Sequence, residues 1–208
     1  MTKAGKRQAI VTAAKELLLE VGYESMSPNK VLERSGAGQG SLYHHFSGKK
    51  QLAQTVLYQV AEDLKADLLS IFTNNDLTPV EKLDHYLARP RHGLKGCKLG
   101  RLSNEKAFAD DDLRQPLQQF FKFALAEVRQ QVEQAVREGL FPADTPVDAI
   151  AHFVMATVQG GYVLSKSVDD DSAVNVSTAG ARVLLRAYQE SALLRAYQES
   201  DPSKAIQR

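Results

Sequence analysis

The 208-residue sequence contains one cysteine, Cys97, and no tryptophan. A single cysteine cannot form a disulfide within the chain, and it excludes a zinc site built from several cysteines. The histidines offer no substitute, because His85, His92 and His152 lack the spacing typical of metal ligands. We therefore expect neither a metal nor a cofactor.

Long apolar segments are also absent. No run approaches the roughly 20 apolar residues that are needed to span a bilayer. The N-terminal stretch carries basic residues, but its apolar part is interrupted by Lys15 and Glu16, unlike a signal peptide. Hydrophobic residues still make up 43% of the chain and charged residues 25%, which are ordinary globular values. The sequence predicts a soluble cytoplasmic protein without a membrane partner.

Net charge is nearly absent as well, because 26 basic residues face 25 acidic residues and leave +1. The two ends of the chain differ, however. Residues 1–60 carry eight basic and four acidic side chains, a net charge of +4, and the remainder carries 18 and 21, a net charge of −3. This asymmetry predicts a polyanionic partner for the N-terminal part.

Alternating strand patterns are lacking, and apolar residues recur at helical spacing almost throughout. Ile10, Leu17 and Val21 illustrate the period in the first segment, which Gly22 ends. Ser27-Pro28 and Thr78-Pro79 are typical helix starts. The predicted fold is all-α with about nine helices. The expected parts are a three-helix head over 1–48, a body over 49–208 that begins with a linking helix over 49–73, and a tail over 192–208.

The tail contains an internal repeat. Val183–Ser191 recurs with one difference as Ala192–Ser200. Nine residues are 2.5 helical turns, so in one continuous helix the copy faces the opposite side. We therefore expect a duplication that only lengthens the helix, with truncation after Ser191 leaving folding and dimerisation intact; a functional tail helix is the alternative.

Residues 28–46 have the layout of a helix-turn-helix. Leu42 and Phe46 can pack inward, which leaves Gln39, Tyr43 and His44 near the exposed side. Such polar side chains suit phosphates, and Gln39 can read a base edge. The same layout also occurs as a purely structural corner, so the geometry alone leaves both interpretations open.

The segment from Ser35 to Leu52, SGAGQGSLYHHFSGKKQL, resembles the recognition-helix signature of TetR/AcrR-family transcriptional regulators. Gly38 departs from that family, which usually has Ser or Thr as the helix cap. The resemblance implies a homodimeric repressor that binds a near-palindromic operator close to its own gene and is released by a small effector. The residues that it implies at the DNA are Ser27, Lys30, Gln39, Gly40, Ser41, Tyr43, His44 and Lys49.

The helix expected over 146–168 separates into two faces at 100° per residue. The mixed face has the composition of a ligand pocket, with ordinary half-buried surface as the alternative. It contains His152, Met155, Gln159, Tyr162 and Lys166. The opposite face is apolar with a small residue at its centre, which suits dimer contact. It contains Ile150, Val154, Thr157, Gly161 and Leu164.

Cys97 lies between two glycines and near three basic side chains, a setting that favours a reactive thiolate. Residues 96–105, together with Lys166, resemble a subgroup of the family that includes the repressor of N-ethylmaleimide reductase. The resemblance implies that electrophiles or oxidants modify Cys97, with Lys166 lowering the thiol pKa and trapping an oxidised sulfur. An inert, buried cysteine is the alternative.

The same sequence is also compatible with other functions. Within the family, the competing hypothesis is a noncovalent sensor whose apolar ligand is held by Leu117, Phe120 and Phe123. Outside it, the chain could be a helical ligand-binding or scaffold protein that does not bind DNA. The sequence contains no nucleophile–base pair, phosphate-binding loop or metal set, so we expect no enzyme.

Overall fold

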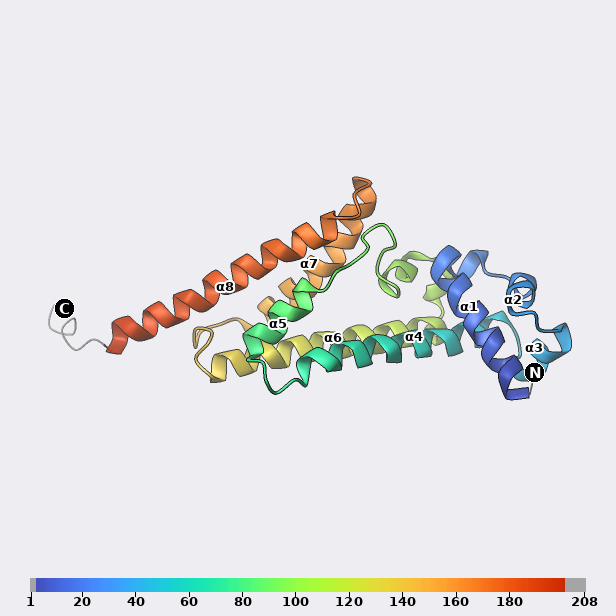
Figure 1. Ribbon diagram of the computed structural model, residues 1–208, viewed down its shortest axis with the longest axis horizontal. Helices are drawn as coiled ribbons and strands as arrows, with labels where there is room; N and C mark the ends of the chain where they lie inside the picture. Colours follow the sequence, from blue (N-terminus) through green and yellow to red (C-terminus); the bar gives the residue numbers. More distant parts are fainter. Residues whose placement is uncertain (1–2, 201–208) are drawn as a thin grey trace. The chain divides into compact units, whose positions relative to one another are not determined.

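The computed structural model describes residues 3–200, and every regular element within that range is helical (Figure 1). This confirms the all-α prediction, with eight α-helices and two short 3-10 helices in place of about nine helices. In chain order the elements are α1 (Lys3–Ser25), α2 (Pro28–Ser35), α3 (Gln39–His45), α4 (Lys49–Phe72), α5 (Pro79–Ala88), η1 (Gly100–Asn104), η2 (Lys106–Ala109), α6 (Asp111–Arg137), α7 (Val147–Ser167) and α8 (Ala173–Ser200).

The chain forms two compact units. The first unit contains the residues up to Ala66 together with Cys97–Lys122, and the second contains Asp67–Gly96 and the chain from Phe123 onward. Helices α4 and α6 each contribute residues to both units. The functional division that the sequence suggests, after residue 48, stays a prediction.

Local capping explains why the helices begin where they do. The Ser27 hydroxyl accepts the backbone N–H of Lys30 at 3.3 Å, and Pro28 occupies the first helical position of α2. Thr78 and Glu81 form a reciprocal capping box at the start of α5. Both predicted start signals are confirmed, because each satisfies backbone N–H groups that the helix itself leaves free.

The sequence over about 101–109 predicts one short helix, but the structure has two 3-10 helices there, η1 and η2. They are separated by Glu105, whose backbone is extended (φ −77°, ψ 138°). The Glu105 carboxylate accepts backbone N–H groups from α1, which lies far away in the sequence. This tertiary contact overrides the local helical tendency of the segment.

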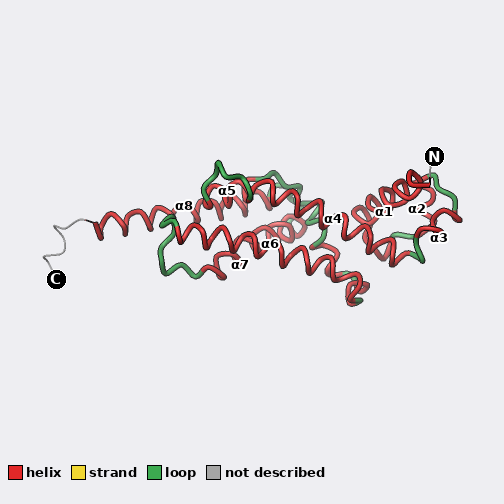
Figure 2. The backbone as a smooth tube through the Cα atoms, turned by 90° about the horizontal axis from the view of Figure 1, so that it is seen from below, coloured by secondary structure: helices red, strands yellow, loops and turns green. Residues whose placement is uncertain are grey.

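In the second unit, α8 packs along α7 and also against α5 (Figure 2). Gly161 of α7 allows the close approach, because a Cβ atom there would lie 2.9 Å from the Cα of Val174. The buried Ser165 hydroxyl accepts the backbone N–H of Val174 at 3.0 Å. Small and hydrogen-bonding residues of α7 therefore join it to α8 of the same chain.

Helix α7 is also the one element of the described chain that is long and apolar enough to cross a membrane, by length and composition only. Ala151, Val154 and Val158 are buried within the unit. The same test is passed by core helices of soluble proteins, so it is weak evidence for a membrane span.

An ion pair links α5 to α8. Arg182 donates two hydrogen bonds of 2.9 Å to the carboxylate of Asp84, and Arg186 donates a third of 3.0 Å. The hydrogen bond from Arg182 holds the pKa of Asp84 below its ordinary value, against desolvation by burial. The pair stabilises the folded chain only while Asp84 is ionised.

We expect Arg182→Ala to lower the free energy of unfolding by about 1 kcal/mol at pH 7. Because the folded pKa lies below the unfolded value of about 3.9, this contribution is present above that pH and lost as the pH falls through the folded pKa. Urea unfolding of both proteins at pH 7 and near pH 2.5 measures it. An equal difference at the two pH values would contradict the assignment.

Candidate nucleic-acid interface and effector site

Helices α2 and α3 form a helix-turn-helix in the first unit. Gly36 ends α2 in the left-handed conformation (φ 64°), and the chain then re-enters a helix at Gln39. Val31, Leu42 and Phe46 are buried, and α1 packs against both helices. The predicted inward face is therefore confirmed, and it fixes which side of α3 remains available.

The available side of α3 carries the predicted DNA-contacting residues. Gln39, Gly40, Tyr43 and His44 are exposed, Tyr43 to 51%, and Ser41 is half-buried. Within residues 3–200 the side chains of Gln39, Tyr43 and His44 form no hydrogen bond that would occupy their polar groups. A Cβ atom at Gly40 would meet no atom within 4 Å, so the fold does not require glycine there.

Ser27, Lys30 and Lys49 already have roles inside the chain. The Ser27 hydroxyl caps α2, and the Lys30 ammonium donates to the carbonyl of Ser25 at 3.1 Å while staying exposed. The Lys49 ammonium lies 4.3 Å from the ring centroid of Tyr23. Burial lowers the pKa of Lys49. Their contacts with phosphate stay predictions.

Two side chains in and just after η1 form hydrogen bonds with the backbone of α1 at the point where that helix is interrupted. Gly22 interrupts α1 with φ 82° and ψ 174°. Arg101 donates to the carbonyls of Leu18 and Leu19 before the break. Glu105 accepts the N–H groups of the two residues after it, Tyr23 at 3.2 Å and Glu24 at 2.9 Å. We call Arg101 and Glu105 the α1 clasp; they satisfy backbone groups that the break leaves unpaired.

Cys97 lies immediately before this clasp in the chain. Its thiol is half-buried, and its sulfur accepts the backbone N–H of Gly100 at 3.3 Å. Burial lowers the pKa of Arg101, whereas the charges of Glu105 and Cys97 raise it. The thiol therefore has the N–H of Gly100 as a hydrogen-bond donor and the Arg101 guanidinium as a charged neighbour.

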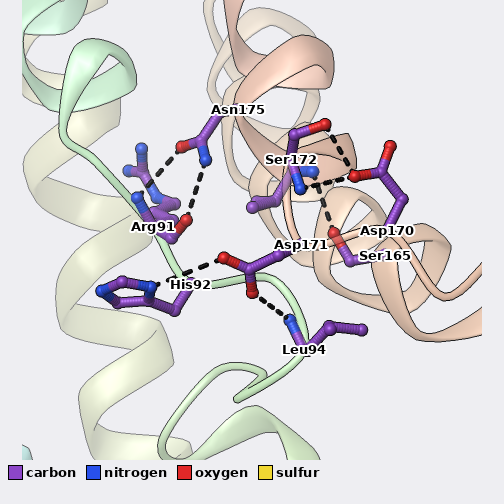
Figure 3. A network of polar contacts seen from close by, with 9 residues as sticks. Arg91, His92, Leu94, Ser165, Asp170, Asp171, Ser172 and Asn175 are labelled. Carbon is purple, nitrogen blue, oxygen red and sulfur yellow. Dashed lines mark hydrogen bonds and ion pairs between the residues drawn. The ribbon is translucent and has the colours of Figure 1, made fainter.

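The segment just before Cys97 belongs to the second unit and is hydrogen-bonded to other residues of that unit (Figure 3). Arg91 and Asn175 exchange two hydrogen bonds, of 3.0 and 2.8 Å. Asp171 accepts the backbone N–H of Leu94 at 2.9 Å and lies 3.5 Å from the His92 ring nitrogen. Residues 91–94 are thus held at the α7–α8 turn, and Cys97 follows them within a few residues.

The α7 side chains expected in an effector pocket have different surroundings. Met155 is buried, and its sulfur accepts the Tyr86 hydroxyl at 3.6 Å. Gln159 and Tyr162 are half-buried, whereas His152 and Lys166 are exposed. Met155 is thus part of the core of the second unit, and the role of this face in ligand binding stays a prediction.

A cavity of about 350 Å³ lies in the first unit beside the start of α6. Its lining is largely apolar, with Arg114 and Lys122 as its charged members. The lining residues are Ser103, Phe108, Arg114, Leu117, Gln118, Phe121 and Lys122. Of the three aromatic and aliphatic residues predicted on α6, Leu117 reaches this cavity; Phe120 is buried and Phe123 half-buried.

The face of α7 expected at a dimer contact is divided. Val154 and Gly161 are buried within the chain, Ile150 and Thr157 are half-buried, and Leu164 is exposed. Helical angles identify two opposite faces but cannot say which one packs on α8. The large exposed apolar side chains of this region are Phe153, Val163, Leu164, Val168, Val176, Val183 and Leu184.

Sequence reasoning missed both the clasp and most of that exposed apolar surface. Glu105 is the last residue of the segment 96–105 singled out above, but nothing local shows that it caps a break about 80 residues earlier. The exposed apolar surface had a signal in the sequence, because Val176 and Val183 are seven residues apart, which is a heptad spacing. Within the described residues, no group of three His, Cys, Asp or Glu side chains could hold a metal ion.

Comparison with known proteins agrees with this geometry. The profile described as "Bacterial regulatory proteins, tetR family" matches residues 10–56, and "Tetracyclin repressor-like, C-terminal domain" matches residues 80–180. An uncharacterized HTH-type transcriptional regulator of Lactococcus lactis is 28% identical over 190 residues, covering 88% of this chain and 93% of its own. The HTH-type transcriptional repressor DhaR of a Mycobacterium species is 26% identical over 168 residues, covering 80% and 85%.

Among solved structures, the reduced form of NemR from E. coli superposes with a TM-score of 0.75. The match covers 85% of this chain and 95% of NemR, at 17% identity. At that identity the likeness establishes the fold alone.

Proposed function

Because the chain belongs to the TetR family of bacterial regulatory proteins, we propose that it is a transcriptional repressor that binds DNA as a homodimer and is released by a small effector. The observation that carries the proposal is the exposed polar face of α3, whose opposite face is buried. The cytoplasm is where such a protein meets its DNA, and no catalytic step is proposed.

Recognition follows from the position of each side chain on α3. Gln39 begins the helix, where an amide reaches a base edge in the major groove. Tyr43 and His44 lie further along, where they donate to phosphate oxygens. A dimer must hold its two α3 helices about 34–36 Å apart to meet successive major grooves. An effector that changes this spacing releases the operator.

The dimer surface that we propose is the exposed apolar strip on α7 and α8. Val163 and Leu164 on α7, and Val176 and Val183 on α8, expose large apolar side chains. Gly180 lies between the two α8 valines, and a Cβ atom there would meet nothing of this chain within 4 Å. Glycine inside a helix costs up to about 1 kcal/mol relative to alanine, so a close approach by a partner helix gives it a reason to be there.

Binding to the DNA upstream of the protein's own gene tests the proposal. Fluorescence anisotropy should show tighter binding to this DNA than to a scrambled duplex of equal length, with affinity falling as salt rises. Equal affinity for both duplexes, or none for either, would favour the alternative of a helical scaffold that does not bind DNA.

For the effector, we propose that electrophiles and oxidants act through Cys97. The supporting observation is the chain segment around the thiol: residues 91–94 are held at the α7–α8 turn, and the α1 clasp begins at Arg101. A group added to sulfur therefore lies four residues before Arg101 in the chain, next to the segment that holds α1. With a quinone, the thiolate adds to a ring carbon, a C–S bond forms, and the resulting enolate takes up a proton.

Cys97→Ser should keep the operator affinity within twofold and lose release by a quinone or by hypochlorite. Lys166→Ala, measured alongside, tests whether that amine contributes to the response. Mass spectrometry of the wild-type protein should find the adduct on Cys97, the one cysteine of the sequence. Normal release of Cys97→Ser would assign sensing to a noncovalent apolar ligand, for which the cavity lined by Leu117 and Phe121 is the first candidate.

A further inference from the structure

The two copies of the nine-residue repeat have opposite environments on α8. Leu185 and Tyr188 of the first copy face their own chain: Leu185 is 4% exposed, and the Tyr188 hydroxyl donates to Thr145 at 3.1 Å. Their counterparts in the second copy, Leu194 and Tyr197, are 62% and 69% exposed. This confirms that a shift of 2.5 turns moves the copy to the other side of the helix.

That other side is an apolar seam. Exposed residues follow one another along α8 at alternating intervals of four and three, which is the spacing of a heptad contact seam. The small and apolar members are Val176, Gly180, Val183, Ala187, Leu194 and Tyr197. Glu190 occupies the one charged position. Without the second copy, the seam would lose its two largest side chains and end at this glutamate.

The second copy extends beyond the rest of the second unit. Figures 1 and 2 both show the last turns of α8 continuing past the ends of α5 and α6. Ala192 of this part is buried, and Arg195 lies 3.3 Å from Asp144 of its own chain. An isolated helix of this length is marginal in water, so a projecting one with exposed leucines gains stability from a packing partner.

We propose that the second copy of the repeat is a dimerisation element, which extends the α8 seam onto a second copy of this chain. The inference rests on the proposed dimer, because the seam is continuous with the apolar strip of α7 and α8. A second copy is the occupant that fits: it presents the same seam, so Leu194 and Tyr197 of each chain meet apolar side chains rather than water. The expectation that the tail is dispensable predicts the opposite behaviour.

The test compares two double alanine variants of the full chain. Leu194→Ala/Tyr197→Ala removes the new seam residues, whereas Gln189→Ala/Arg195→Ala changes positions at least 80° away around the helix. Alanine preserves helix propensity in both. Analytical ultracentrifugation at nanomolar to micromolar concentration gives the dimer dissociation constant. We expect a rise of about 30-fold or more for the seam variant and less than threefold for its control.

Each remaining outcome overturns a specific statement. A dimeric wild type whose dissociation constant the seam variant leaves within threefold refutes the tail as a dimerisation element but not the proposed function. A comparable rise in both variants refutes the seam. A wild type that is monomeric at all concentrations, and that does not bind operator DNA, refutes the proposed dimeric repressor itself.

Discussion

Tyr43→Ala is expected to abolish operator binding, with an affinity at least about 100-fold lower, while the dimer mass and thermal unfolding remain those of the wild type. The tyrosine is half-exposed on α3 and its hydroxyl has no hydrogen-bond partner within residues 3–200, so the fold loses little with it. Each subunit of the dimer loses one contact with DNA, worth about 1.5 kcal/mol of binding free energy. The two losses add to about 3 kcal/mol, which corresponds to an affinity at least about 100-fold lower.

Two further variants show whether the loss of affinity comes from the Tyr43 hydroxyl and whether it is specific to α3. Tyr43→Phe removes the hydroxyl alone, and an intermediate loss would assign part of the energy to a phosphate hydrogen bond. Val21→Ala, which removes exposed apolar surface from α1 of the same unit, should bind like the wild type. Wild-type affinity of Tyr43→Ala for the upstream DNA would refute the assignment of α3 as the recognition helix.

Gly22→Ala should destabilise the first unit by about 3 kcal/mol or more and weaken operator binding with it. The backbone at Gly22 (φ 82°, ψ 174°) lies in a region that is essentially restricted to glycine, which costs other residues about 1–3 kcal/mol. A Cβ atom there would also lie 2.4 Å from Oε1 of Glu105. Relieving that overlap displaces the carboxylate that caps Tyr23 and Glu24.

Gly36→Ala provides the matched control. Gly36 also has a positive φ, 64°, but a Cβ atom there would meet nothing within 4 Å, so only the backbone penalty of about 1–2 kcal/mol applies. Urea unfolding gives both values. The double variant Gly22→Ala/Glu105→Ala should lose less free energy of unfolding than the two single variants lose together, because the overlap between the added Cβ atom and the Glu105 carboxylate is gone. Equal destabilisation by the two glycine substitutions would contradict the clasp.

The sequence alone predicted the helices that carry their own signals. Ser27-Pro28, Thr78-Pro79 and the break at Gly22 act through backbone N–H groups and dihedral angles within a few residues of themselves. The exposed side of α3 could be predicted for a related reason, because Leu42 and Phe46 left one orientation for that helix. For the repeat, the helical period was enough to place Leu194 opposite Leu185.

Tertiary structure decided what depends on residues distant in the sequence. The two faces of α7 were predicted, but the contact of Gly161 with Val174 determined which one packs on α8. Glu105 separates η1 from η2 because it caps α1, about 80 residues earlier. The periodicity of the sequence predicts which residues share a face of a helix. Which face is buried depends on segments distant in the sequence, because the native packing is the one that removes apolar area from water and gives buried polar groups their hydrogen bonds.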